Sequence, residues 1–396
     1  MQAIWFFIAN LVSLIGSSIS MVAIPWFVLQ VSGDIAITSF IMSVRILPTI
    51  ISLFIGTHLF ENYTNRWICI ISDLFSGTLI ISIPLLFHYD YLTLPLLLAI
   101  ICAEGAVEQI NRTSLSAMMP EVINKNNYSF ERFNGIIGSL HNIGDLLGPA
   151  LAGVIISIIG NSAAFIIDGI TFFVSALIFK IFLTNLNRKF KSKSEEETTS
   201  LRKIKKGIIF IFNHPHIKYA AVLSITVNFL IMPLLTLVLP LMAQTKLENT
   251  IDLGFLFSTF GTGTLIASLA FTLYGSKMKK KRMMVGCSVL LFFSLVLGGL
   301  IKLKLGLYFI IFFIGLSVGF LGPLDNTILQ QYAPEEKRGL IFLIYTSLRF
   351  LSIPLSYILF GFTLKLFPIF ITFFFMAAIV FFQLIYIIPA KIDYEG

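Results

Sequence analysis

Residues 4–31 read IWFFIANLVSLIGSSISMVAIPWFVLQV, 28 consecutive residues without a charged side chain. A helix of about 20 apolar residues is long enough to cross the hydrocarbon core of a bilayer, so this stretch predicts a membrane-spanning helix. No basic residue precedes it and no small-residue cleavage pattern follows it. We therefore expect a retained span rather than a signal peptide.

Similar apolar segments recur along the rest of the chain at near-regular spacing. They are continuously apolar, whereas the strands of a membrane barrel alternate over roughly 10 residues, so the pattern favours helices. The sequence predicts an all-α membrane protein with twelve transmembrane helices in two six-helix halves. The predicted spans are residues 4–31, 35–59, 67–88, 92–111, 133–158, 161–183, 219–243, 252–275, 283–301, 305–325, 339–362 and 366–388.

The bulk composition excludes a soluble globular protein. Hydrophobic residues make up 57% and charged residues 12% of the 396 positions, and the mean hydropathy is +0.92, outside the range of soluble domains. A net charge of +8 could indicate a nucleic-acid partner, but the basic residues lie mostly in short turns, where topology accounts for them.

The three cysteines lack metal-ligand spacing. We expect the lipid bilayer as a partner and no nucleic acid, metal or bound cofactor.

The distribution of Lys and Arg predicts the orientation. One set of alternate turns, together with the chain ends, holds 21 of the 28 basic residues. Because loops rich in Lys and Arg remain on the cytoplasmic side, we expect a multi-pass protein of the inner or plasma membrane with both termini in the cytoplasm.

The longest polar segment, residues 184–218, divides the predicted spans into six and six. We expect a six-helix half at 1–183, a cytoplasmic linker at 184–218 and a second six-helix half at 219–396. NRTSLSAMMPEV from Asn111 aligns without a gap to DNTILQQYAPEE from Asp325, which indicates internal duplication. Parallel duplication of a six-helix unit is a transporter architecture, with the substrate site expected between the halves near the midplane.

The second part of the linker has the pattern of an amphipathic helix. Apolar residues recur there at helical spacing against a basic face, which predicts a helix lying on the inner leaflet. An ordinary solvated linker is the alternative. The apolar positions are Leu201, Ile204, Ile208 and Ile211.

The predicted fifth span reads GIIGSLHNIGDLLGPALAG over residues 135–153. Small residues four apart let two helices approach closely, and a proline permits a bend. The spacing resembles the antiporter motif of drug-exporting members of the major facilitator superfamily, with Ala152 in place of one glycine. That resemblance implies a role in conformational change, and a Gly-rich packing helix is the alternative. The motif residues are Gly135, Gly144, Gly148, Pro149 and Gly153.

The turn after the second span, GTHLFENYTNRW, resembles in degenerate form the loop motif of the same superfamily. Glu61 stands for the acid of that motif and Arg66 for one of its basic residues. The resemblance implies an inner gate at this loop, and a plain topology signal is the alternative.

A closer resemblance runs over most of the chain, including VAIPWFVLQVSG, SAMMPEVINKNN and KGIIFIFNHPHIKY. These stretches look like the exporter subfamily that includes macrolide-efflux and enterobactin-type siderophore-exporting proteins. The resemblance implies the major facilitator fold and a small-molecule substrate, and we expect a monomer. Ser17 follows Gly16 where many such relatives carry an acid, a departure that argues against a proton site in the first span.

Four ionisable side chains lie near the middle of their predicted spans, roughly 15 to 20 Å deep at about 1.5 Å per residue. A charge at this depth is costly, so such residues usually face a wet cavity or a partner and are functional candidates. They are Arg45, Glu104, Asp145 and Arg349.

Two pairs of residues four apart are candidates for proton coupling. Glu104 and Glu108 share one helix face, where repulsion and desolvation favour protonation of one carboxylate. The alternative for Glu104 is an ion pair with a mid-depth arginine. His141 and Asp145 could relay protons, or could simply hold two helices together.

Three further aspartates are interpreted mainly as structural. Asp73 and Asp325 lie near the cytoplasmic ends of their predicted spans, where water is available. Asp168 in the outer third of the sixth span could meet substrate, although a hydrogen bond to a neighbouring helix accounts for it as well.

These features together favour a secondary active transporter, a proton-coupled exporter of a drug, siderophore or similar amphipathic molecule that works by alternating access. The proton gradient is the expected driving force. A metabolite or lipid permease of the same fold is the alternative within transport. A membrane receptor or enzyme is the alternative outside it. The sequence contains no H-E-x-x-H pair, and its G-x-S-x-G string, GLSVG at 315–319, lies within an apolar span rather than on a strand-to-helix turn.

Overall fold

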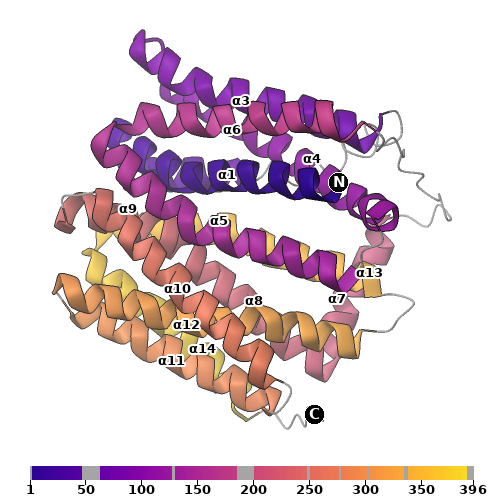
Figure 1. Ribbon diagram of the computed structural model, residues 1–396. Coiled ribbons are helices and arrows are strands. Elements are labelled where there is room, and N and C mark those ends of the chain that lie inside the picture. Colours follow the sequence, from indigo (N-terminus) through magenta and orange to yellow (C-terminus); the bar gives the residue numbers. More distant parts are fainter. Residues whose placement is uncertain are drawn as a thin grey trace. The chain divides into compact units, whose positions relative to one another are not determined.

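The computed structural model describes residues 2–46, 63–126, 130–184, 200–247, 250–275, 278–301, 303–333 and 338–389 (Figure 1). Helices account for nearly all of them, and the described residues contain no extended strand. The all-α prediction is confirmed. Ten of the described helices are long and apolar enough to cross a membrane. The shorter apolar helices Ile35–Ile46 and Leu147–Ile158 lie in the two remaining predicted spans.

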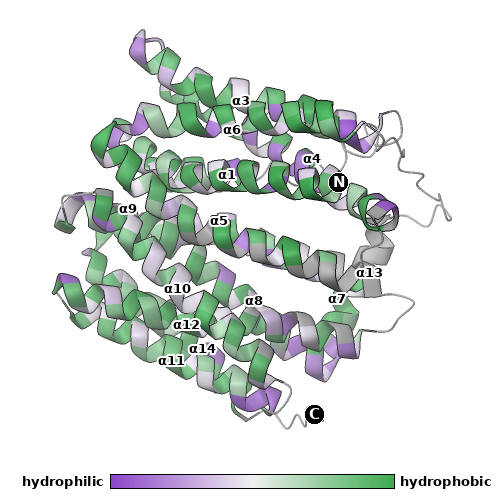
Figure 2. Cartoon of the chain, in the orientation of Figure 1, coloured by the Kyte–Doolittle hydropathy of each residue, from purple (hydrophilic) through white to green (hydrophobic). Residues whose placement is uncertain are grey.

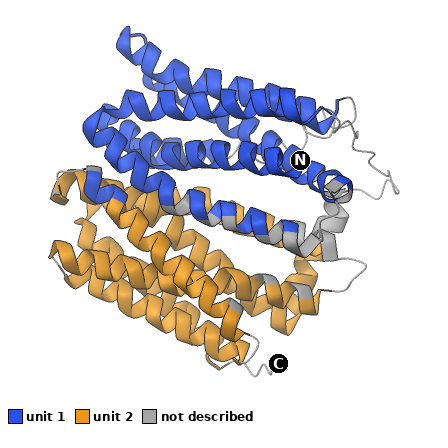
Figure 3. Cartoon of the chain, viewed as in Figure 1, with its two compact units in different colours: residues 1–193, 248–254 blue, residues 194–247, 255–396 orange. Residues whose placement is uncertain are grey.

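Contact clustering divides the chain into two compact units (Figure 3). Unit 1 comprises Met1–Lys193 and Glu248–Gly254, and unit 2 comprises Ser194–Leu247 and Phe255–Gly396. The main boundary falls inside the segment that the sequence predicts as a linker.

In unit 1, a bundle of long helices surrounds a core of aromatic and aliphatic side chains. Helix α1 packs on α5 and α6, and α3 packs on α4 and α6. The helices are α1 (Gln2–Ser32), Ile35–Ile46, α3 (Asn65–His88), α4 (Leu94–Asn126), α5 (Phe130–Ile158) and α6 (Asn161–Phe182).

In unit 2, α8 packs on α12 and α13, and α11 packs on α12 and α14. The chain from Pro215 to Leu247 is continuously helical, with two π-helical segments, η1 and η2. Pro233, which cannot donate a backbone hydrogen bond, immediately precedes η1. The elements are α7 (Ser200–Asn213), α8 (Pro215–Pro233), η1 (Leu234–Val238), α9 (Leu239–Met242), η2 (Ala243–Leu247), α10 (Thr250–Tyr274), α11 (Lys280–Leu300), α12 (Lys304–Tyr332), α13 (Arg338–Leu366) and α14 (Ile369–Ile387).

The amphipathic helix predicted in the linker is present as α7. Ile211 is fully buried, and Ile208 packs against the same cluster as Leu329 of α12 and Ile344 of α13. Part of the apolar stripe that the sequence assigns to the inner leaflet is therefore buried in protein.

Large apolar side chains are exposed along the spans as well as buried inside the units. Phe75 of α3, Phe255 of α10 and Phe382 of α14 are examples, and Figure 2 shows the helices as predominantly hydrophobic along their lengths. In water this exposure would be costly. It is the surface expected of a protein whose solvent is lipid.

Candidate functional site

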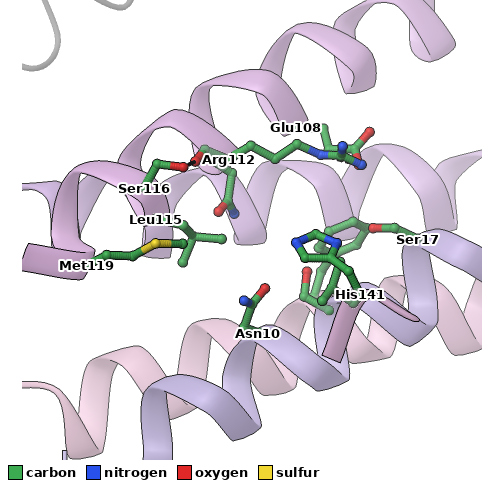
Figure 4. A pocket seen from close by; sticks show the side chains of 12 residues that line it. Asn10, Ser17, Glu108, Arg112, Leu115, Ser116, Met119 and His141 are labelled. Atoms are coloured by element: carbon green, nitrogen blue, oxygen red, sulfur yellow. Dashed lines mark hydrogen bonds and ion pairs between the residues drawn. The ribbon is translucent and has the colours of Figure 1, made fainter. Parts of the chain in front are cut away.

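Unit 1 contains a cavity of about 230 Å³. Figure 4 shows Glu108 and Arg112 of α4 along one side, with Asn10 and Ser17 of α1 and His141 of α5 facing them. The lining is mixed, because polar and charged groups alternate with aliphatic and aromatic side chains. The lining residues are Asn10, Ser13, Leu14, Ser17, Glu108, Asn111, Arg112, Leu115, Ser116, Met119, His141 and Phe172.

Helix α1 contributes a row of small polar side chains to this cavity. Asn10, Ser13 and Ser17 recur at the spacing that places residues on one helix face. The sequence analysis missed them, although a polar stripe within a span otherwise free of charge was the visible signal. They provide hydrogen-bonding groups without the cost of a buried charge.

Four charged side chains form a cluster, which we call the charged cluster: Arg45, Glu104, Glu108 and Arg112, of which Glu108 and Arg112 line the cavity. Arg45 Nη2 lies 3.0 Å from Glu104 Oε2 and 3.5 Å from Glu108 Oε2. Arg112 Nη2 lies 2.6 Å from Glu108 Oε1. Two carboxylates are thus matched by two guanidinium groups, which offsets the cost of placing charge in an apolar protein.

Gly105 makes the central contact of this cluster possible. A side chain at this position would meet the Arg45 backbone oxygen, because an ideal Cβ there would lie 2.8 Å from that atom. The helix Ile35–Ile46 therefore comes close to α4 at Gly105, and Arg45 reaches both carboxylates from this position.

The two ends of the charged cluster differ in their access to solvent. The side chain of Glu104 is 3% exposed, whereas that of Arg112 is 59% exposed. Glu104 forms an ion pair with a mid-depth arginine, Arg45, and its role in proton coupling stays a prediction. Arg112, which the sequence analysis counted only as a topology signal, is a member of the cluster and lines the cavity.

The fifth-span motif brings α5 close to α1. A Cβ on Gly148 would lie 2.2 Å from the Cβ of Ser18 and 3.1 Å from its carbonyl carbon, and a Cβ on Gly144 would lie 3.4 Å from Ser18 Oγ. The predicted close approach of two helices is therefore present at these two glycines, and the partner is α1.

The structure gives less information on the remaining residues of the motif helix. Pro149 and Gly153 are buried, and His141 lines the cavity. Gly135 lies in α5, and neither its burial nor the side chain of Asp145 is described, so the suggested pairing of His141 with Asp145 stays a prediction.

Asp168 of α6 is 1% exposed and accepts a hydrogen bond from Ser20 Oγ of α1. It is not among the residues that line the cavity of unit 1. Of the roles considered for Asp168, contact with substrate or a hydrogen bond to a neighbouring helix, the structure contains the hydrogen bond.

Arg66 holds the end of α6. Its Nε donates to the Phe179 backbone oxygen at 3.0 Å and its Nη2 donates to the Lys180 backbone oxygen at 2.7 Å. These carbonyls belong to the last turn of a helix and have no intrahelical partner. Glu61, the acid predicted for the same inner-gate loop, lies outside the described residues.

Unit 2 contains a second cavity of about 190 Å³, lined in part by Ser224 and Asn228 of α8 and by Asp325 of α12. Arg349 of α13 also lines it, and its Nη1 lies 3.4 Å from Asp325 Oδ2. Tyr345 donates its hydroxyl to Asp325. Asp325, interpreted from the sequence as a solvated structural residue, is in fact 4% exposed.

The two cavities use corresponding positions of the duplicated sequence. The alignment of Asn111 with Asp325 places these residues 214 positions apart, and each lines the cavity of its own unit. At the same separation Asn10 corresponds to Ser224 and Leu14 to Asn228, and all four also line the cavities. The two units thus line their cavities from corresponding positions, but the side chains at these positions differ.

Among the described residues, no group of three or more His, Cys, Asp or Glu side chains could hold a metal ion.

Comparison with known proteins identifies the family and several relatives. The model of the Major Facilitator Superfamily matches residues 6–357. The Multidrug efflux pump Tap of Mycobacterium tuberculosis is 24% identical over 358 residues, which cover 89% of this chain and 84% of the relative. Macrolide efflux protein A of Streptococcus pyogenes is 21% identical over 353 residues, covering 88% and 85%.

Two solved transporter structures have the same fold. The nucleoside transporter NupG superposes with a TM-score of 0.75 at 11% identity, covering 99% of this chain and 100% of that one. A POT family transporter in complex with a thioalcohol-conjugated peptide also gives a TM-score of 0.75, at 12% identity, covering 98% and 95%.

Proposed function

The chain belongs to the major facilitator superfamily, and from that premise we propose that it is a proton-coupled exporter of a drug, siderophore or similar small amphipathic molecule. It is a multi-pass membrane transporter and not an enzyme. Relatives that cover most of the chain are multidrug and macrolide efflux pumps, and they support export as the direction of transport.

One observation carries the coupling part of this proposal: Arg45 bridges Glu104, which is buried, and Glu108, which lines the cavity of unit 1. An ion pair holds two helices together only while both partners are charged. Protonation of Glu104 removes its attraction to Arg45, and loss of the proton restores it. This difference between two states is what a driven conformational change requires.

The cavity supports an amphipathic substrate. Its lining places Asn10, Ser13 and Ser17 within reach of the same ligand as Leu115 and Phe172. A cavity of this composition binds a ligand by burial of apolar surface and orients it by a few hydrogen bonds. A strongly hydrophilic ion would leave the apolar walls unused.

Alternating access is the mechanism proposed for the transport cycle. In this cycle the substrate site is open first to the cytoplasm and then to the outside. We propose a monomer in the plasma membrane with both termini in the cytoplasm, as the bias of basic residues predicts.

The proposal is tested in liposomes that contain the purified protein, with a pH-sensitive dye inside and erythromycin, a macrolide, as the probe. Addition of the drug should speed the movement of protons down an imposed pH gradient, and the gradient should drive the drug across the membrane. Empty liposomes give the background. Absence of both drug-dependent proton movement and gradient-dependent drug flux, for erythromycin and for a panel of other drugs and siderophores, would reject the proposal.

A further inference from the structure

Asp73 lies in the first half of α3 and is 1% exposed. The expectation that water solvates this carboxyl group is therefore wrong. The side chains that hydrogen-bond to this carboxyl group are neutral: Asn111 of α4 and Ser175 of α6. None of the salt bridges between described residues involves Asp73. An ionised carboxylate buried among neutral groups is costly unless it acquires a proton.

One oxygen of Asp73 and the amide oxygen of Asn111 lack hydrogen-bond partners. Asn111 Nδ2 donates to Asp73 Oδ1. Asp73 Oδ2 and Asn111 Oδ1 are both buried and both lack a hydrogen-bond partner. Buried polar atoms without a partner are uncommon in native proteins, and each calls for an explanation.

A single proton satisfies both of these oxygens. A protonated carboxyl group has one O–H donor, and an amide oxygen is an acceptor. An O–H on Asp73 Oδ2 that donates to Asn111 Oδ1 closes a ring with the bond that is already present, in which acid and amide each donate once and accept once.

We propose that Asp73 and Asn111 form a cyclic acid–amide pair and that this pair is a proton-binding site of the transporter. The proton is held on Asp73 Oδ2. On release it passes to water in the cavity, and the carboxyl group becomes a carboxylate. No other bond is made or broken.

The position of Asn111 links this site to the substrate cavity. Asn111 lines the cavity of unit 1 although it is only 6% exposed. Its amide has two N–H donors and one acceptor oxygen, so a ligand in the cavity that binds the amide competes with Asp73 for these groups. A ligand that draws the amide into the cavity takes Asn111 away from the acid, leaves Ser175 as its remaining partner and admits water, so substrate binding promotes release of the proton.

This site differs chemically from Glu104. Glu104 is paired with a guanidinium group, whereas Asp73 is held by neutral donors. The coupling role of Asp73 rests on the proposed proton-driven export, but its proton can be detected without any transport.

Infrared spectroscopy of the purified protein in lipid nanodiscs tests the assignment. At neutral pH the wild-type minus Asp73→Asn difference spectrum should contain the C=O stretching band of a protonated carboxyl group, and that band should shift to lower frequency in D₂O. Asp90→Asn is the matched control. Asp90 lies in a surface turn at φ 59°, a conformation that Asn also tolerates, and its difference spectrum should lack the band.

Asn111→Leu provides a second, independent measurement. Without the amide, the carboxyl band should still be present, but its frequency should be higher, because the O–H and C=O groups of the acid lose their partner. Absence of the carboxyl band from the wild-type minus Asp73→Asn spectrum, with the variant folded, overturns the proposal. A band that Asn111→Leu does not move also overturns the pairing. Neither outcome depends on whether erythromycin is exported.

Discussion

The Nη2 atom of Arg45 donates a hydrogen bond of 3.0 Å to Oε2 of Glu104, a residue 59 positions away in the sequence. The bond joins the helix Ile35–Ile46 to α4 and buries a carboxylate whose side chain is 3% exposed. Removal of one member of a buried ion pair leaves the other charge uncompensated, which is more costly than the pair itself. The contact therefore responds strongly to the protonation state of Glu104.

Glu104→Gln imitates the protonated carboxyl group, because the side chain keeps its size and loses its charge. We expect this variant to bind substrate but to lose flux driven by a pH gradient. The measurement is drug uptake into liposomes with and without the gradient. Glu121→Gln is the matched control, since Glu121 forms an ion pair with Lys125, four residues further along the same helix. Wild-type flux with unchanged pH dependence in Glu104→Gln would remove Glu104 from the coupling mechanism and make Asp145 the next residue to test.

Gly148→Leu should abolish transport while the protein still inserts in the membrane. Even a Cβ at this position would lie 2.2 Å from the Cβ of Ser18, so a leucine forces α5 away from α1. Gly138→Leu on the same helix is the matched control, because no atom lies within 4 Å of its Cβ position. Drug flux is compared at equal amounts of inserted protein. Normal flux in Gly148→Leu would contradict a need for the close packing of these helices.

Pro149→Ala should reduce flux less than Gly148→Leu does. Alanine adds no bulk at the interface, and it restores a backbone N–H donor that proline lacks. The expected effect is a stiffer helix and slower turnover at unchanged apparent affinity, measured from the concentration dependence of drug flux. A loss of inserted protein instead of a loss of rate would assign Pro149 a folding role.

Arg66→Ala should lower the free energy of unfolding by about 2 kcal/mol, because hydrogen bonds from a charged donor to buried carbonyls are of this order. The variant leaves the Phe179 and Lys180 carbonyls at the end of α6 without their donors. Thermal unfolding in detergent, monitored by cysteine accessibility, measures the change. Lys180→Ala keeps the backbone carbonyl and serves as the control. If both variants unfold at the wild-type temperature, Arg66 does not stabilise this helix end.

The orientation is tested by reporters. Tags at the two chain ends and within residues 184–218 should report cytoplasm, because the turns on that side hold 21 of the 28 basic residues. A reporter at Glu248, which lies outside the described residues, should report the outside. A cytoplasmic signal at Glu248 would mean that the number of spans before it is wrong.

Much of the candidate site was visible in the sequence. Glu104 and Glu108 were found because carboxylates at mid-depth stand out in an apolar span, and Gly148 was found because of its spacing within a known motif. Arg112 and the row Asn10, Ser13 and Ser17 were missed. Arg112 looked like a topology residue, and uncharged polar residues cost too little in a span to stand out.

The burial of Asp73 could not be predicted from its position along the helix. Its position near the start of α3 predicted contact with water, but packing against α4 and α6 leaves it 1% exposed. The depth of a residue along a helix axis can be predicted from its position in the sequence. The exposure of its side chain also depends on which way the residue faces and on which helices cover that face.

The sequence by itself determined that this chain crosses a membrane as helices, because a span must satisfy its backbone hydrogen bonds internally and uninterrupted apolar runs of sufficient length allow only helices to do so. It also determined the internal duplication and the family. Only the tertiary structure decided that Arg45 pairs with Glu104, that Asn111 pairs with Asp73 and that Gly148 meets Ser18. Each of these contacts depends on the rotation and crossing of two helices, which are set by packing between distant segments and not by the local pattern of either one.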